Sequence, residues 1–151
     1  MSDVNRISAV TLAIKNMEKS CKFYSRIPGF KIIYGGSPSD FFTIFQIGKH
    51  DDDKNYLNLE LRRNTSNNKD NNISIQIDFG RIIFQTDDVD KLYLKLKNDE
   101  FVSKYAFFEG EPIDAVWGER FFHIRDPDGY QISFAKPLIS QPRKIKNSDN
   151  N

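Results

Sequence analysis

The sequence predicts an α+β fold built from two similar βαβββ modules. Three observations support this prediction. In each half of the chain, stretches in which apolar and polar residues alternate flank one stretch with helical periodicity. The order of these stretches is the same in both halves. In addition, residues 12–19 align with residues 84–91 as a weak internal repeat, which favours two copies of one unit.

The first half begins with a strand, because apolar and polar positions alternate along residues 7–14. Asn16 can then cap a helix, in which apolar residues recur at helical spacing as far as Tyr24. The dipeptide Pro28-Gly29 marks the turn that follows this helix. Three further strands are expected at residues 30–34, 41–47 and 56–61.

The second half repeats this order after a polar, Asn-rich stretch. Residues 82–84 are expected to form a strand, and Asp87-Asp88 can cap the helix that follows it. The apolar stripe of this helix consists of Val89, Leu92 and Leu96. The remaining strands are expected near residues 105–108, 119–125 and 130–135.

These elements predict a single domain over residues 1–139. Module one covers about 4–62, module two covers about 79–138, and a linker at 63–78 joins them. Residues 140–151 carry basic side chains among Asn and Ser with almost nothing apolar to bury, which predicts a disordered tail.

Composition excludes several classes of partner. Lys and Arg number 22 and Asp and Glu number 21, so no net field favours nucleic acid or an anionic membrane. Cys21 is the single cysteine, and one cysteine cannot form an internal disulfide. No apolar run is long enough to span a bilayer, and the first residues lack the apolar core of a signal peptide. We therefore expect a cytoplasmic location.

The segment 117–134 is the most specific motif in the chain, with an Asp-Pro-Asp-Gly turn at 126–129 between two expected strands. Together with Phe23-Tyr24 and the segment 28–30, it resembles the vicinal oxygen chelate superfamily, the glyoxalase, bleomycin-resistance and extradiol dioxygenase group. The resemblance covers roughly residues 7–138. It implies that the two modules curl into a half-open barrel around a cavity, commonly completed in a homodimer.

Members of this superfamily hold a divalent metal with four side chains, two from each module. The matching positions here are Ala9, Glu60, Arg81 and Ser133, of which only Glu60 can ligate a metal as the family does. One carboxylate holds a divalent cation poorly, because a lasting site needs three or more protein ligands. We therefore expect no metal and no other cofactor, and metal-dependent glyoxalase I or extradiol dioxygenase activity is disfavoured.

The resemblance also places Glu60 and Arg81 on the wall of one cavity. We hypothesise that they form an ion pair in place of the metal, since an unpaired charge in a partly dry cavity is costly. Both a structural pair and an arginine that binds an anionic ligand are open at this point.

Two aromatic residues of the motif carry alternative interpretations. If Arg125 pairs across the turn with Tyr130, His123 points toward the helices and is structural, whereas a bulge would turn it toward the cavity. Trp117 can stack on an aromatic ligand or close the rim of the barrel.

The leading hypothesis is a metal-free protein that binds a small molecule in the barrel cavity, and that has neither a nucleic acid nor a membrane as partner. The expected ligand-binding residues are Glu60, Arg81, Tyr56, Trp117 and Ser133, while no catalytic residue is identified. The alternative is a lyase, isomerase or dioxygenase relative that uses Glu60 as base and Arg81 to stabilise developing charge. A third possibility is an interaction module with a filled cavity.

Overall fold

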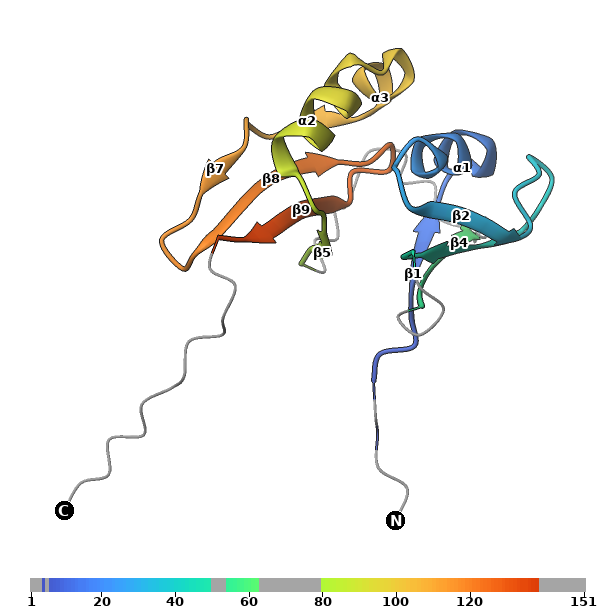
Figure 1. Ribbon diagram of the computed structural model, residues 1–151. Coiled ribbons are helices and arrows are strands. Elements are labelled where there is room, and N and C mark those ends of the chain that lie inside the picture. Colours follow the sequence, from blue (N-terminus) through green and yellow to red (C-terminus); the bar gives the residue numbers. More distant parts are fainter. Residues whose placement is uncertain (1–3, 5, 50–53, 63–79, 139–151) are drawn as a thin grey trace.

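The computed structural model describes residues 4, 6–49, 54–62 and 80–138. Two β-sheets lie side by side, and the helices cover the same side of both (Figure 1). The predicted linker at 63–78, the predicted tail at 140–151 and the loop residue His50 lie outside the described residues. Among the described residues, no helix is both long and apolar enough to cross a membrane.

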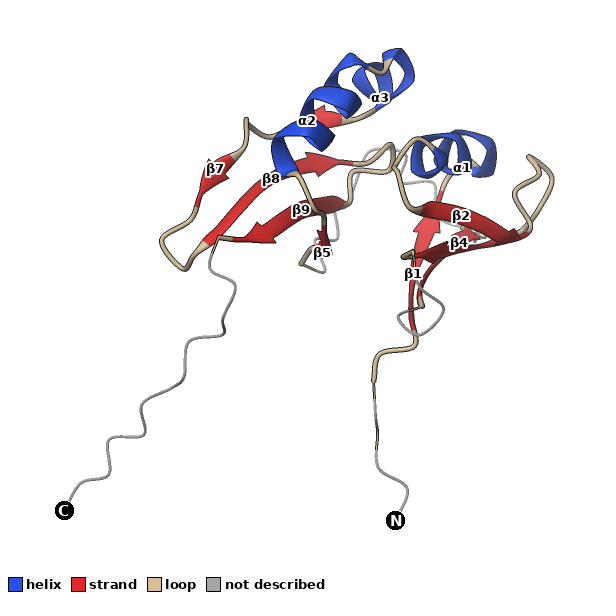
Figure 2. Ribbon diagram, in the orientation of Figure 1, coloured by secondary structure: helices blue, strands red, loops and turns tan. Residues whose placement is uncertain are grey.

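Module one forms a four-stranded sheet with one helix above it (Figure 2). The order of its strands is β1-β4-β3-β2; β1 runs parallel to β4, and the other neighbours are antiparallel. Its elements are β1 (Ala9–Ile14), α1 (Met17–Ser25), β2 (Phe30–Tyr34), β3 (Phe42–Ile47) and β4 (Asn55–Leu61). The predicted order of this module is confirmed.

Module two repeats the arrangement, with strand order β5-β9-β8-β6, β5 parallel to β9, and a short β7 beside β8. Its elements are β5 (Ile82–Gln85), α2 (Val89–Asn98), α3 (Glu100–Tyr105), β6 (Phe107–Phe108), β7 (Ile113–Asp114), β8 (Glu119–Arg125) and β9 (Gln131–Pro137). The expectation of a strand from Tyr105 is wrong at that residue, because Tyr105 ends the extra helix α3. The α+β class is confirmed, and within the described residues the two sheets stay separate and form no closed barrel.

The predicted caps start both long helices. The side chain of Asn16 accepts a hydrogen bond from the backbone N–H of Lys19 at 2.8 Å, and Asp88 accepts one from Lys91 at 2.9 Å. Each cap satisfies an N–H that has no partner inside the helix.

The core lies between the sheets and their helices. Alternation along each strand sends one set of side chains toward the helices, where Leu12, Leu59 and Phe134 are at most 2% exposed. The opposite side of each sheet carries no helix of the described residues and is called here the open face (Figure 1). In module one the open face includes Thr11, Ala13, Tyr56, Asn58 and Glu60.

The turn at Asp126–Tyr130 joins module two to module one, and its contacts are called here the module junction. The hydroxyl of Tyr24 on α1 donates to Oδ2 of Asp126 at 2.6 Å. The carboxylate of Asp128 accepts hydrogen bonds from the backbone N–H of Lys15 at 2.9 Å and from the hydroxyl of Ser20 at 3.1 Å. The hydroxyl of Tyr130 donates to the carbonyl of Ala13 at 2.8 Å. Four hydrogen bonds thus fix the last hairpin against the first strand and helix.

Candidate functional site

The register of the last hairpin decides which way His123 points. Arg125 pairs with Gln131, not with Tyr130, and the same register places His123 opposite Ser133. The register considered from the sequence is therefore wrong by one residue, and a shift of one residue moves every side chain to the other face. His123 consequently lies on the open face of module two, not on the helix side.

His123 and two neighbours form a polar cluster on this face. Its Nδ1 hydrogen-bonds the hydroxyl of Ser133 on β9, and its Nε2 lies 3.5 Å from Nη1 of Arg81, which immediately precedes β5. A guanidinium can only donate, so Nε2 accepts and the ring proton sits on Nδ1. Arg81 and Ser133 are thus held by a neutral imidazole between them.

The electrostatics of the cluster agree with a neutral His123. Burial lowers the pKa of His123 from its usual value, and the positive charge of Arg81 lowers it further. The Nδ1 atom of His123 that faces the Ser133 hydroxyl carries the ring proton, so it cannot act as a base that would make this hydroxyl a nucleophile. The arrangement is suited to holding a ligand group next to Arg81 and not to acyl transfer.

An aromatic row continues from His123 toward the start of β8. The ring centroids of Phe121 and His123 are 4.7 Å apart, and those of Trp117 and Phe121 are 6.0 Å apart and nearly parallel, at 19°. Trp117 is 60% exposed, and its indole N–H donates to the carboxylate of Glu119 at 3.1 Å. The open face of module two therefore offers flat apolar surface beside a cation.

The other two residues expected from the sequence lie on module one. Glu60 is exposed on β4, opposite Ala13 on β1 and Phe42 on β3. Tyr56 is half-buried on the same face, four residues before Glu60 and opposite Ala9. Of the five residues predicted to contact ligand, the structure brings together only Arg81 and Ser133, and the residue that joins them is His123.

Within the described residues, no ion pair joins Glu60 to Arg81 in one chain. The two side chains belong to the open faces of different sheets. A contact between them in the single chain would require the two faces to turn toward each other.

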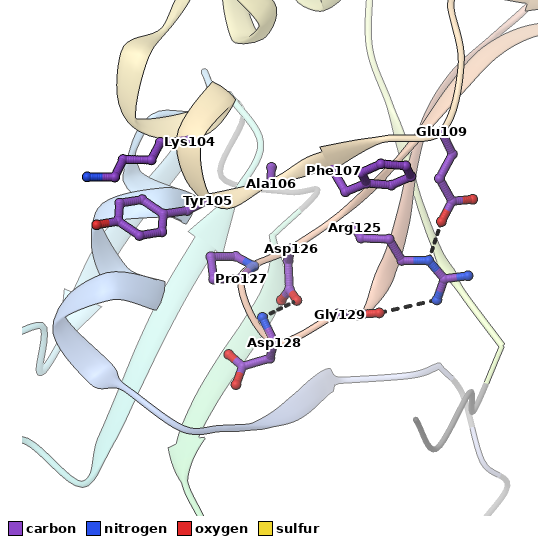
Figure 3. A pocket seen from close by; sticks show the side chains of 10 residues that line it. All are labelled: Lys104, Tyr105, Ala106, Phe107, Glu109, Arg125, Asp126, Pro127, Asp128 and Gly129. Carbon is purple, nitrogen blue, oxygen red and sulfur yellow. Dashed lines mark hydrogen bonds and ion pairs between the residues drawn. The ribbon is translucent and has the colours of Figure 1, made fainter. Parts of the chain in front are cut away.

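A cavity of about 600 Å³ lies at the other end of β8, between α3, β6 and the turn of the module junction (Figure 3). The guanidinium of Arg125 on its wall is held by the carboxylate of Glu109 and donates to the carbonyl of Gly129 at 3.2 Å. The residues that line the cavity are Lys104, Tyr105, Ala106, Phe107, Glu109, Arg125, Asp126, Pro127, Asp128 and Gly129. The residues predicted from the sequence to bind ligand are not among them, so the cavity and the polar cluster are separate features.

Residues 6–134 match the sequence profile of the Glyoxalase/Bleomycin resistance protein/Dioxygenase superfamily. The chain belongs to this superfamily. No curated protein matches it. Identity to solved members is low, so their likeness concerns the fold.

Three solved structures illustrate the shared superfamily fold. A glyoxalase/bleomycin resistance protein/dioxygenase from Nocardioides has a TM-score of 0.65 at 17% identity, over 95% of this chain and 91% of that one. A family enzyme from Burkholderia phytofirmans PsJN has a TM-score of 0.63 at 16% identity, over 87% and 98%. A bleomycin resistance determinant encoded on the transposon Tn5 has a TM-score of 0.61 at 18% identity, over 89% and 100%.

The four positions expected from the sequence to match the superfamily's metal ligands do not fit a divalent cation. Ala9 has no donor atom, Arg81 is a cation, and the hydroxyl of Ser133 is engaged with His123, which leaves the carboxylate of Glu60 alone. Among the described residues, no group of three or more His, Cys, Asp or Glu side chains could hold a metal ion.

His123 is the residue that the sequence analysis did not place in the site. Its orientation depends on how many residues the turn contains, and alternation within a strand does not report this number. The orientation of His123 could have been predicted from Asp126, a residue type that often hydrogen-bonds the backbone of its own turn. In the structure its Oδ1 accepts from the backbone N–H groups of Asp128 and Tyr130, so Tyr130 belongs to the turn and Gln131 begins the strand.

Proposed function

We propose that the protein is a metal-free member of the superfamily that binds a small molecule against the open faces of its sheets, within a single domain spanning residues 1–139. The proposed ligand contacts are Glu60, Arg81, Tyr56, Trp117 and Ser133. We add His123, since it contacts both Arg81 and Ser133.

The polar cluster of module two is the observation that carries this proposal. A guanidinium and a neutral imidazole occupy the face on which relatives hold a metal ion. Flat aromatic surface adjoins them, and a few convergent polar groups beside apolar walls are typical of ligand sites.

A homodimer belongs to the same proposal. Ile83 and Trp117 are 56% and 60% exposed on the module-two side, and large exposed apolar surfaces mark sites of association or ligand binding. A second copy that laid its open faces on these would convert them into a closed cavity.

The test starts with the metal content of the purified, untagged protein, followed by calorimetric titration with nickel, zinc, manganese and iron(II). We expect no stoichiometric metal. One tightly bound ion per chain would reject the proposal and favour a metalloenzyme. A small-molecule screen that follows the fluorescence of Trp117, the single tryptophan of the chain, then tests binding at the open face.

A further inference from the structure

The open face of module two has opposite charges at its two ends. Glu119 lies beside Trp117 at the start of β8, with its carboxylate accepting the indole N–H. Arg81 lies at the other end, against His123. Phe121 lies between them and contacts both Trp117 and His123. A ligand placed along this row would feel a field that draws its negative end toward Arg81.

The cation at Arg81 has capacity for an anionic ligand. Among the described residues, the guanidinium contacts the Nε2 atom of His123, a neutral acceptor, and no carboxylate forms an ion pair with it. A guanidinium has five N–H donors in a plane that matches a carboxylate, and one bond to an imidazole leaves most of them available.

The apolar side chains beside Arg81 determine which uncharged part of a ligand can bind. Trp117 and Phe121 present flat rings, and Ile83 on β5 adds an exposed aliphatic side chain on the same face, opposite Ser133. Aromatic ligands gain from offset stacking on such rings. A carboxylate monoanion matches the single positive charge of Arg81, whereas a phosphate dianion would bring a second negative charge that no cation of the cluster balances.

From this row we infer that the site binds aromatic carboxylic acids, with the ring on Phe121 and Trp117 and the carboxylate at Arg81. Phe121 and His123 are two residues apart on one strand face, a spacing of roughly 7 Å. The site therefore prefers an acid whose carboxylate is separated from the ring by a short alkyl chain over one attached directly to it. This inference rests on the proposed function and names its ligand class.

The experiment titrates the full-length protein with benzoate, phenylacetate and hydrocinnamate, and with the amide and the amine that correspond to hydrocinnamate. The readout is the fluorescence of Trp117. Hydrocinnamate should bind more tightly than benzoate and about tenfold or more above its amide, because the amide loses the charge-assisted bond to Arg81. The amine, which brings a cation to Arg81, should bind least.

Variants locate the site. Arg81→Gln should weaken hydrocinnamate binding about tenfold or more. Lys95→Gln removes one positive charge from the exposed side of α2, away from the open face, and should leave affinity unchanged. Phe121→Leu should weaken binding severalfold, whereas Phe107→Leu, at an exposed ring on β6, should not.

A second readout leaves every residue of the proposed site unchanged. The NMR titration of His123 gives its pKa with and without acid, and His50→Gln assigns the signal between the chain's two histidines. The charged groups around His123 are Arg81, Glu109 and Arg125. A carboxylate bound at Arg81 adds a negative charge and should raise the pKa of His123.

Three results would overturn the inference. Binding of the amide or amine as tight as that of the acid would reject the ligand class while the proposed function stands. Acid binding that Arg81→Gln leaves unchanged, with an unaltered His123 pKa, would reject the site. The absence of any ligand across a broad screen, with a strictly monomeric protein, would reject the proposed function itself.

Discussion

The carboxylates of Asp126 and Asp128 accept three of the four hydrogen bonds that join the two modules at the module junction. Asp126 is 3% exposed, and its oxygens accept from the hydroxyl of Tyr24 and from the backbone N–H groups of Asp128 and Tyr130. Burial raises the pKa of Asp126 to about 6, although these hydrogen bonds act against the rise. Asp126 is therefore costly to ionise in the folded chain.

Removal of the Tyr24 hydroxyl tests this arrangement. Tyr24→Phe leaves Oδ2 of Asp126 buried without its donor, and an unsatisfied buried acceptor costs about 1–3 kcal/mol. We expect the free energy of unfolding in urea to fall by that amount. The matched control is Tyr34→Phe, at a residue 62% exposed, which should change stability by less than about 0.5 kcal/mol. Equal effects in both variants would contradict the role of the junction.

The pKa of Asp126 also predicts a pH dependence. Since the folded pKa lies above the unfolded value of 3.8, the unfolded chain releases this proton first as pH rises. The contribution of Asp126 to the free energy of unfolding is therefore highest below about pH 4, falls between about pH 4 and 6, and stays low above pH 6.

Asp126→Asn isolates this contribution, because an amide of the same shape does not titrate. The free energy of unfolding of the variant, relative to the parent protein, should rise by about 2 kcal/mol between pH 4 and pH 7. Urea unfolding at several pH values measures it. A difference that is flat across this interval would show that Asp126 titrates as it does in the unfolded chain.

Among the elements, the β2–β3 hairpin depends on a close approach of backbone. Gly35 has φ of +71°, and an added Cβ would lie 2.3 Å from the carbonyl oxygen of Phe42. Gly29 has φ of +88° with nothing within 4 Å of its added Cβ. Both positions disfavour a side chain through their backbone angle, but only Gly35 adds a collision with backbone.

The two glycines form a matched pair of variants. Gly29→Ala should destabilise the protein by about 1–2 kcal/mol through its backbone conformation alone. Gly35→Ala should cost clearly more, because the hairpin must open to relieve the collision. Thermal and urea unfolding of the two variants measure the difference. If Gly35→Ala lowered the free energy of unfolding no more than Gly29→Ala does, β2 and β3 would separate at Gly35 at little cost.

The elements also show what the sequence could and could not predict. Strand alternation and the caps at Asn16 and Asp88 are local patterns, and the structure confirms them. The extra helix α3 was missed although Asp99 caps it by accepting from the N–H groups of Phe101 and Val102. The orientation of His123 and its contact with Arg81 depend on hairpin register and sheet neighbours, which no local pattern contains.

For the whole molecule, the proposed dimer gives the clearest prediction. In the part of the chain that the structure describes, no helix covers the open faces of the sheets, and Ile83 and Trp117 lie largely in solvent. We expect sedimentation at micromolar concentration to give twice the chain mass of 17.6 kDa. A sedimenting monomer would contradict the shared cavity and leave each open face as a separate surface.

The module junction also sets an order of events during protein synthesis. Ribosomes extend chains at about 5–20 residues per second, so the turn at Asp126–Tyr130 emerges roughly 3–13 seconds after β4 is complete at Leu61. Throughout that interval the Tyr24 hydroxyl and the Lys15 amide of the nascent first half lack their carboxylate partners. The first half therefore gains these hydrogen bonds only after the β8–β9 turn has been synthesised. Full stabilisation of its helix α1 is a late step of biogenesis.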